Sequence, residues 1–236
     1  MGLLKGLPNA QERLRLFEAD IYNPYEFEPA IQGCKYIFHL ATPLQHEPKD
    51  TQFKNTSEAA VSGLNSIVRS CIKSGTVKRL IYTASVAAAS PIKDSGIGFQ
   101  KYMDESCWTP LNLLYPLANQ TLMDLLGKVP IVHIEDVCEA HILCIEKSCI
   151  SGRFLCASAY LSSAEIASHW KTYYPDIRIA EEFVEDLGRE IVWGSTELEK
   201  IGFEYKFDAK VILDETLKWA QKMGEFGSSQ EIIVSK

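Results

Sequence analysis

The sequence predicts an α/β fold in which a parallel sheet is flanked by helices. Two observations lead to this prediction. In the first half of the chain, short apolar runs alternate with segments of helical periodicity, as in successive βαβ units. After an irregular stretch over residues 86–126, rich in proline and glycine, a second and shorter alternation begins. The second alternation predicts a smaller α/β lobe towards the C-terminus.

The first strand and helix candidates are short. Leu14–Phe17 predicts a strand, and Pro24–Ile31 predicts an acidic helix that Gly33 closes. Tyr36–Ala41 is a continuous apolar run that Thr42 and Pro43 end, which is typical of a parallel strand buried on both faces.

The next helix and strand complete a βαβ pattern. Apolar residues recur at spacings of three and four, Gly75 is placed to end the helix, and Arg79–Thr83 predicts the following strand. We therefore expect parallel pairing of the strands on either side of this helix. The apolar stripe consists of Val61, Leu64, Val68, Cys71 and Ile72.

The second half of the chain gives weaker signals. Acidic residues at 135 and 136 favour a helix start, and Ser162 or Ser163 can cap another helix. The expected elements are a helix over 121–126, a strand over 129–133, a helix over 135–147, a strand over 153–156, a helix over 163–173, a strand over 178–183 and a closing amphipathic helix over 210–223.

Composition excludes several classes of function. With 236 residues, 46% of them hydrophobic, the chain can form one domain with an appended lobe. A net charge of -7 without a basic cluster argues against nucleic-acid or anionic-membrane partners. Seven cysteines without a C-x-x-C pair indicate reduced thiols of a cytoplasmic protein. No apolar stretch reaches membrane-spanning length.

Metal and hydrolase chemistry find little support. His133, Cys138, His141 and Cys144 lie close in sequence, but only His141 and Cys144 share a helix face at a spacing of three. We expect no metal site there. No G-x-S-x-G elbow is present, and the adjacent residues Glu135 and Asp136 point to different helix faces, unlike a glycosidase pair.

A specific order of motifs carries a family resemblance. The motifs are Arg13–Asp20, Gly33–Pro43, Val77–Ser85, Asp104–Trp108, Pro130–His141 and Gly152–Cys156. Together they resemble the plant dihydroflavonol reductases, which belong to the extended short-chain dehydrogenase/reductases of the NAD-dependent epimerase/dehydratase superfamily. The segments Ala87–Pro91 and Cys107–Asn112 resemble the anthocyanidin-reductase-like branch.

The resemblance implies an incomplete Rossmann-like parallel sheet flanked by helices, with a smaller C-terminal α/β substrate-binding lobe. The residual dinucleotide-binding region would cover residues 1–126, the substrate lobe 127–224 and a tail 225–236. The implied activity is hydride transfer from NADPH to a carbonyl or conjugated ring of a phenolic small molecule, which makes the chain by family an NADPH-dependent oxidoreductase acting on a CH-OH/C=O group of a flavonoid-like or other phenolic compound.

The family's catalytic residues are a serine, a tyrosine and a lysine four positions after the tyrosine. Only the serine has a counterpart, Ser85. No tyrosine in the chain is followed by such a lysine, and Tyr115 has Asn119 at that position. The lysine's charge lowers the tyrosine pKa, so its loss together with the tyrosine removes the proton donor.

Cofactor contacts can be carried over by motif. The resemblance implies that Asp20 and Ile21 approach the adenine and that Leu40, Ala41, Thr42 and Pro43 line the ribose and phosphates. Structural roles are the alternative, because an aspartate after a strand often caps a helix and Ala-Thr-Pro often ends a strand.

Two losses separate this chain from the family pattern. No glycine-rich loop precedes the first strand, and residues 122–128 pass directly to a later family segment, which indicates an internal deletion. We expect a narrowed sheet, with Leu14–Phe17 beside Tyr36–Ala41 or unordered. The chain is then either a working reductase with another acid, or a catalytically incompetent relative that binds ligands or partners, or a non-functional splice or gene-model product.

Overall fold

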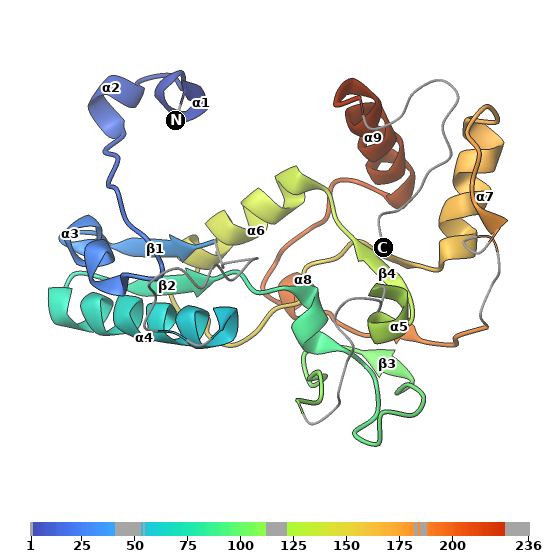
Figure 1. Cartoon of the computed structure of the whole chain (residues 1–236), viewed down its shortest axis with the longest axis horizontal. Coiled ribbons are helices and arrows are strands. Elements are labelled where there is room, and N and C mark those ends of the chain that lie inside the picture. Colours follow the sequence, from blue (N-terminus) through green and yellow to red (C-terminus); the bar gives the residue numbers. More distant parts are fainter. Residues whose placement is uncertain are drawn as a thin grey trace. The chain divides into compact units, whose positions relative to one another are not determined.

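The computed structural model describes residues 2–40, 53, 55–111, 122–181, 184 and 188–224. The predictions for residues 41–43, Tyr115 and the tail 225–236 lie outside this range. The chain divides into two compact units, Met1–Thr83 and Ala84–Lys236, which Figure 1 shows in sequence colours. The functional boundary at residue 126 remains a prediction.

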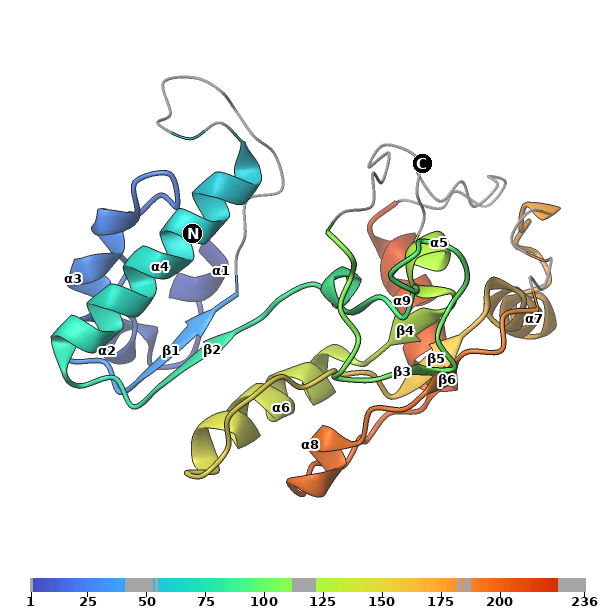
Figure 2. The same cartoon turned by 90° about the horizontal axis from the view of Figure 1, so that it is seen from below.

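The first unit contains one βαβ arrangement. Strands β1 and β2 pair in parallel, with Tyr36 opposite Arg79 and His39 opposite Tyr82. Helix α4 runs along one side of this pair (Figure 2). The elements are α1 (Gly2–Lys5), α2 (Ala10–Arg13), η1 (Pro24–Phe27), α3 (Glu28–Ile31), β1 (Tyr36–His39), α4 (Thr56–Ser74) and β2 (Arg79–Tyr82). The predicted helices over 24–31 and before Gly75, the strands that begin at Tyr36 and Arg79, and their parallel pairing are confirmed.

Helix α4 ends at Gly75 as the sequence predicts, and it begins at Thr56, for which no cap was predicted. The Asn55 side chain accepts the Glu58 N–H at 2.9 Å, and Gly75 ends the helix with a left-handed φ of 66°. The predicted apolar stripe is partly wrong, because Val61 and Ile72 are 61% and 75% exposed. The buried side instead includes Ala59 and Gly63, whose small size lets the helix approach its neighbours closely.

Two strand predictions for the first unit are corrected. Leu14–Phe17 is extended but belongs to no strand, and Leu16 and Phe17 are exposed. Strand β1 is covered on one face only: Ile37 packs in the cluster of Ile31, Ile67 and Cys71, whereas Phe38 is 40% exposed. The sheet is narrowed as expected, but the segment 14–17 does not contribute to it.

The second unit contains two small sheets. Strand β3 pairs with β6 in parallel, and β4 pairs with β5 antiparallel. A core of Ala89, Met103, Leu126, Leu155 and Ile191 lies beside them. The elements are η2 (Val86–Ala89), β3 (Tyr102–Met103), α5 (Leu122–Leu126), β4 (Val129–Ile131), α6 (Ile134–Glu146), β5 (Ala159–Leu161), α7 (Ser163–Tyr173), β6 (Val192–Trp193), α8 (Glu197–Lys200) and α9 (Ala209–Lys222).

The helices of this unit match the sequence better than its strands do. The predicted helices over 121–126, 135–147, 163–173 and 210–223 and the strand over 129–133 are confirmed as α5, α6, α7, α9 and β4. The strand predicted over 153–156 is wrong, because the Leu155 N–H donates to a Glu105 carboxylate oxygen at 2.9 Å and not to a strand. The strand predicted over 178–183 is absent from its described residues 178–181, where Ile179 forms only an isolated bridge.

Helices α7 and α9 are joined by an ionic cluster. Ser162 and Glu165 form a capping box that fixes the start of α7. Further along α7, the His169 Nε2 lies 2.7 Å from Asp214 Oδ1 of α9, and Lys210 Nζ lies 2.8 Å from Asp214 Oδ2. Hydrogen bonds from Lys210 and His169 lower the pKa of Asp214 to about 2.

Across the described residues, no helix is long and apolar enough to cross a membrane.

Alanine at Gly127 is expected to destabilise the chain more than alanine at Gly98. Both glycines have a left-handed φ, 77° and 74°, so both variants pay about 1–2 kcal/mol for that conformation. A Cβ at Gly127 would also lie 2.1 Å from Ile191 Cδ1, which adds about 1–3 kcal/mol of overpacking. Nothing lies within 4 Å of a Cβ at Gly98. Urea denaturation measures the free energy of unfolding of the two variants. An equal decrease in both would contradict the close packing of Ile191 on Gly127.

Asp214 is expected to make stability depend on acid pH. Since folding lowers its pKa from 3.8 to about 2, its ion pairs stabilise the folded state above about pH 4 and are lost as the pH falls through 2. The variant Asp214→Asn cannot titrate, so its unfolding free energy should be lower above pH 4 and change less with pH. Urea denaturation from pH 5 to pH 2 compares the two proteins. Parallel curves would show that Asp214 is not the group responsible.

Candidate functional site

Ser85 lies between strand β2 and η2, in the second unit. Its side chain is exposed and its Oγ accepts the Ala87 N–H at 3.2 Å, so it caps the short helix. A hydroxyl carries one donor and two acceptor positions, and the cap uses one acceptor. The Ser85 O–H therefore remains available to donate to a substrate oxygen.

Two partly buried tyrosines of the second unit, Tyr160 and Tyr205, are not suited to be the missing acid. The Tyr160 O–H donates to the Leu126 carbonyl oxygen. Burial raises the pKa of Tyr160 to about 12 and burial likewise raises the pKa of Tyr205, whose oxygen accepts the Ala157 N–H at 3.1 Å. A proton donor works best with a pKa near the operating pH. The two hydroxyls bond the backbone at Leu126 and Ala157, and their raised pKa values keep them protonated at neutral pH.

Asp20 forms a turn in the first unit. Its Oδ1 accepts the Tyr22 N–H at 3.0 Å, and its own N–H donates to Glu26 Oε2 at 2.9 Å. The sequence left open a helix-capping role beside the adenine role, but the residue at the N-cap of η1 is Asn23, so Asp20 forms a turn and not a helix cap. The side chain is exposed, so its other oxygen can still accept a hydrogen bond from a ligand.

Ile21 and Leu40 differ in their surroundings. Ile21 packs on the cluster of Ile31, Ile67 and Cys71, and a Cβ on Gly63 would lie 2.5 Å from its Cδ1. Leu40 is 62% exposed at the end of β1. Asp20, Ile21 and Leu40 belong to the first unit, and Ser85 belongs to the second.

The described residues fit a dinucleotide only in part. Asp20 supplies an acceptor suited to an adenine amino group or a ribose hydroxyl. A pyrophosphate needs several free backbone N–H groups at a helix N-terminus. At the start of α4, Asn55 already occupies the Glu58 N–H, and no glycine-rich turn stands before any helix that the structure describes. The described residues therefore do not form the pyrophosphate part of the site.

Sequence reasoning missed a polar network around Glu105 in the second unit. The Glu105 carboxylate accepts the Leu155 N–H at 2.9 Å and the Ser195 hydroxyl at 2.6 Å. Arg153 donates to the carbonyl oxygens of Glu105 and Cys107 and stacks on the Trp108 ring at 3.7 Å. The signal was present, because Glu105 and Arg153 are charged residues inside two family motifs. This network fixes the loop after β3.

The two histidines at the start of α6 and within it form structural hydrogen bonds. His133 Nδ1 accepts the Glu135 N–H at 3.2 Å, and its Nε2 lies 2.9 Å from Glu215 Oε2. His141 Nδ1 lies 2.7 Å from the Val137 carbonyl oxygen within the helix. No group of three or more metal-ligating side chains gathers among the residues with described positions. All seven cysteines are free thiols.

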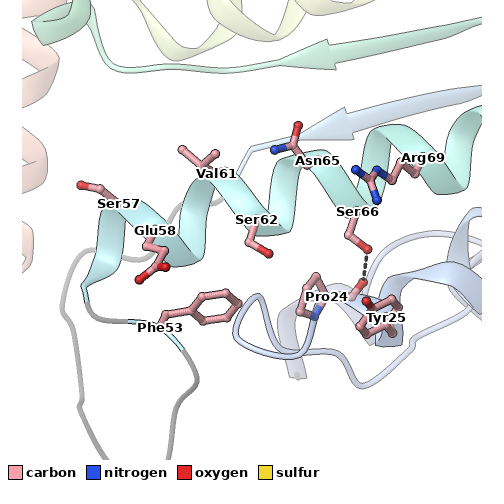
Figure 3. Close-up of a pocket in the computed structure, with 10 residues that line it drawn as sticks. All are labelled: Pro24, Tyr25, Phe53, Ser57, Glu58, Val61, Ser62, Asn65, Ser66 and Arg69. Atoms are coloured by element: carbon pink, nitrogen blue, oxygen red, sulfur yellow. Dashed lines mark hydrogen bonds between the residues drawn. The ribbon is translucent and has the colours of Figure 1, made fainter.

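A cavity of about 600 Å³ lies in the first unit, between α4 and the segments at Pro24 and Phe53. Figure 3 shows its lining residues. None of the residues predicted to bind the cofactor or to act in catalysis lines this cavity. Sequence reasoning gave no signal for it, because its walls come from the polar side of α4 and from an isolated phenylalanine.

Comparison with known proteins places these features in context. The 3-beta hydroxysteroid dehydrogenase/isomerase family matches residues 6–111. The anthocyanidin reductase of Arabidopsis thaliana is 27% identical, covering 89% of this chain and 81% of the relative. A dihydroflavonol 4-reductase of Solanum lycopersicum is 27% identical over 91% of this chain and 69% of the relative. The vestitone reductase of alfalfa matches in structure with a TM-score of 0.74 at 23% identity, covering 95% of this chain and 88% of that one.

The alignment also bears on the internal deletion. The match to the Arabidopsis relative extends over 277 residues, which exceeds the 236 residues of this entire chain. The relative therefore carries residues inside the matched region that have no counterpart here. The fold match to vestitone reductase supports the α/β, Rossmann-type prediction, although the sheets in this chain are small.

Tyr160→Phe is expected to lower the free energy of unfolding by about 1 kcal/mol, because it removes the hydrogen bond to the Leu126 carbonyl. Tyr102→Phe is the matched control, since the Tyr102 ring is half exposed and contacts the Lys101 ammonium group through its face. Chemical denaturation of the two variants and the parent chain provides the measurement. A Tyr102→Phe loss as large as that of Tyr160→Phe would contradict the anchoring role.

Proposed function

This chain belongs to the extended short-chain dehydrogenase/reductase family of the anthocyanidin and dihydroflavonol reductases, as a distant homologue over most of its length, and from that premise we propose that it is an impaired flavonoid-type reductase. By descent it would act on a CH-OH or C=O group of a flavonoid-like phenolic compound, with NADPH, in the cytoplasm. In this polypeptide the turnover would be strongly reduced.

One observation carries the proposal. Of the family's serine, tyrosine and lysine, the chain retains only Ser85, and no Tyr-x-x-x-Lys segment occurs anywhere in its sequence. NADPH, when bound, would supply the hydride, but a carbonyl oxygen also needs a proton as the hydride arrives. Ser85 can hold the substrate oxygen by hydrogen bonding. A serine hydroxyl does not replace the acidic tyrosine.

The internal deletion accounts for this loss. The relatives carry extra residues within the matched region, and the sequence around residues 114–128 joins two family segments that are separated in the resemblance. We propose that the missing stretch includes the Tyr-x-x-x-Lys helix and a strand. The missing strand also explains why β2 has no second neighbour in the sheet that the structure describes.

The alternative is a protein without turnover that acts by binding. The Ser85 O–H, which donates to no described group, would allow a contact with a substrate-like ligand to persist after catalysis is lost. The impaired enzyme keeps a weak turnover, whereas this alternative has none. The two also differ in NADPH binding, which only the impaired enzyme retains.

We expect NADPH oxidation by this chain, with an anthocyanidin or a dihydroflavonol as acceptor, to be at least about 10²-fold slower than that of the Arabidopsis anthocyanidin reductase measured alongside. The reason is the loss of general acid catalysis, which contributes about 10²–10⁴ in rate. NADPH fluorescence titration accompanies the assay. Weak turnover with measurable NADPH binding supports the impaired enzyme, and no NADPH binding supports the binding protein.

Ser85→Ala provides the control. In an impaired enzyme that uses Ser85, this variant lowers the residual rate further without changing NADPH affinity. Turnover equal to that of the Arabidopsis relative would refute the proposal, and its loss in Ser85→Ala would then show that the reaction depends on Ser85.

A further inference from the structure

The cavity beside α4 has two different sides. Ser62 and Ser66 point from α4 towards Phe53 and Pro24 on the opposite side, and Arg69 lies beside Ser66 on the helix (Figure 3). Its volume of about 600 Å³ lies within the usual range for small-molecule sites, about 300–1,000 Å³. The cavity lies entirely within the first unit.

The side opposite α4 is apolar and braced. Phe53 is held by the ring of Tyr22, with 6.1 Å between ring centroids. Pro24 is buried, and its carbonyl oxygen accepts the Ser66 hydroxyl at 3.2 Å, which ties this side to the helix. Tyr25 is 74% exposed, so its ring is accessible to a ligand. Flat rings on this side offer faces on which an aromatic ligand can pack.

The helix side carries an unpaired cation. Arg69 has no carboxylate partner among the residues that the structure describes, whereas Lys73, one turn further along α4, pairs with Glu28 at 2.5 Å. The Ser62 hydroxyl also makes no hydrogen bond to any described group. Glu58 lines the other end of the cavity, near Phe53 and away from Arg69 (Figure 3). A negative group on a ligand is therefore favoured at the Arg69 end.

We propose that this cavity binds a small aromatic carboxylate. The ring packs against Phe53 and Pro24, a polar ring substituent reaches the Ser62 hydroxyl, and the carboxylate pairs with Arg69, whose guanidinium matches a carboxylate in shape and charge. This site shares no residue with the predicted cofactor and catalytic positions. It is therefore independent of the proposed reductase activity.

Calorimetric titration of the full chain tests the proposal with three probes: 4-hydroxycinnamate, its uncharged alcohol 4-hydroxycinnamyl alcohol, and AMP, which joins an aromatic base to a phosphate. We expect 4-hydroxycinnamate to bind more tightly than the other two. The Arg69 side chain is exposed, so solvent weakens its pairing with a carboxylate and Arg69→Gln should reduce the affinity by only about fivefold. Added salt should reduce the affinity as well, because it screens an exposed ion pair.

Arg15→Gln is the matched control, since Arg15 is exposed in the same unit, does not line the cavity, and its loss changes the net charge equally. It should bind 4-hydroxycinnamate like the parent chain. Ser62→Leu should fill the cavity and abolish binding, with circular dichroism confirming that α4 is intact. Equal binding of the alcohol, tighter binding of AMP, unchanged affinity in Arg69→Gln or no binding of 4-hydroxycinnamate would each overturn the proposal.

Discussion

Buried backbone N–H and C=O groups need hydrogen-bond partners, and in this chain side chains supply many of them where a wide sheet would use neighbouring strands. The Glu105 carboxylate receives the Leu155 N–H, and the buried Asp136 carboxylate receives the Lys206 and Phe207 N–H groups. Tyr205 and Tyr160 bond the backbone at Ala157 and Leu126. These contacts hold the two small sheets of the second unit and the loops around them in place.

The same requirement explains which parts of the structure the sequence could predict. Helices satisfy their backbone groups locally, so boundary residues such as Gly75 and Ser162, together with the apolar periodicity, were sufficient to predict α4 and α7. Strands depend on distant neighbours. The apolar run Arg153–Cys156 has the composition of a strand, but its backbone bonds a carboxylate, and the two-residue strand β3 has no pattern that could have indicated it.

The candidate site shows a similar division. Motif order alone identified the family and placed Ser85 at the end of its strand, because those residues are contiguous in sequence. It did not foresee that Asp20 would form a turn with Tyr22, or that Ile21 would pack so closely on Gly63. Both depend on the three-dimensional approach of η1 and α4. The cavity beside α4 escaped prediction for the same reason, since Phe53 and Arg69 are far apart in sequence.

The β1–β2 pair has a consequence for the life of the protein in a cell. Parallel sheets are normally covered on both faces, whereas here the aromatic residues Tyr36 and Phe38 are partly exposed and each strand pairs only with the other in the described chain. Such a surface resembles that of a folding intermediate, which chaperones and proteases recognise. The unpaired edges of β1 and β2 in the described chain also offer N–H and C=O groups with which a strand of another chain can pair, so this pair is a place where the polypeptide can associate with itself.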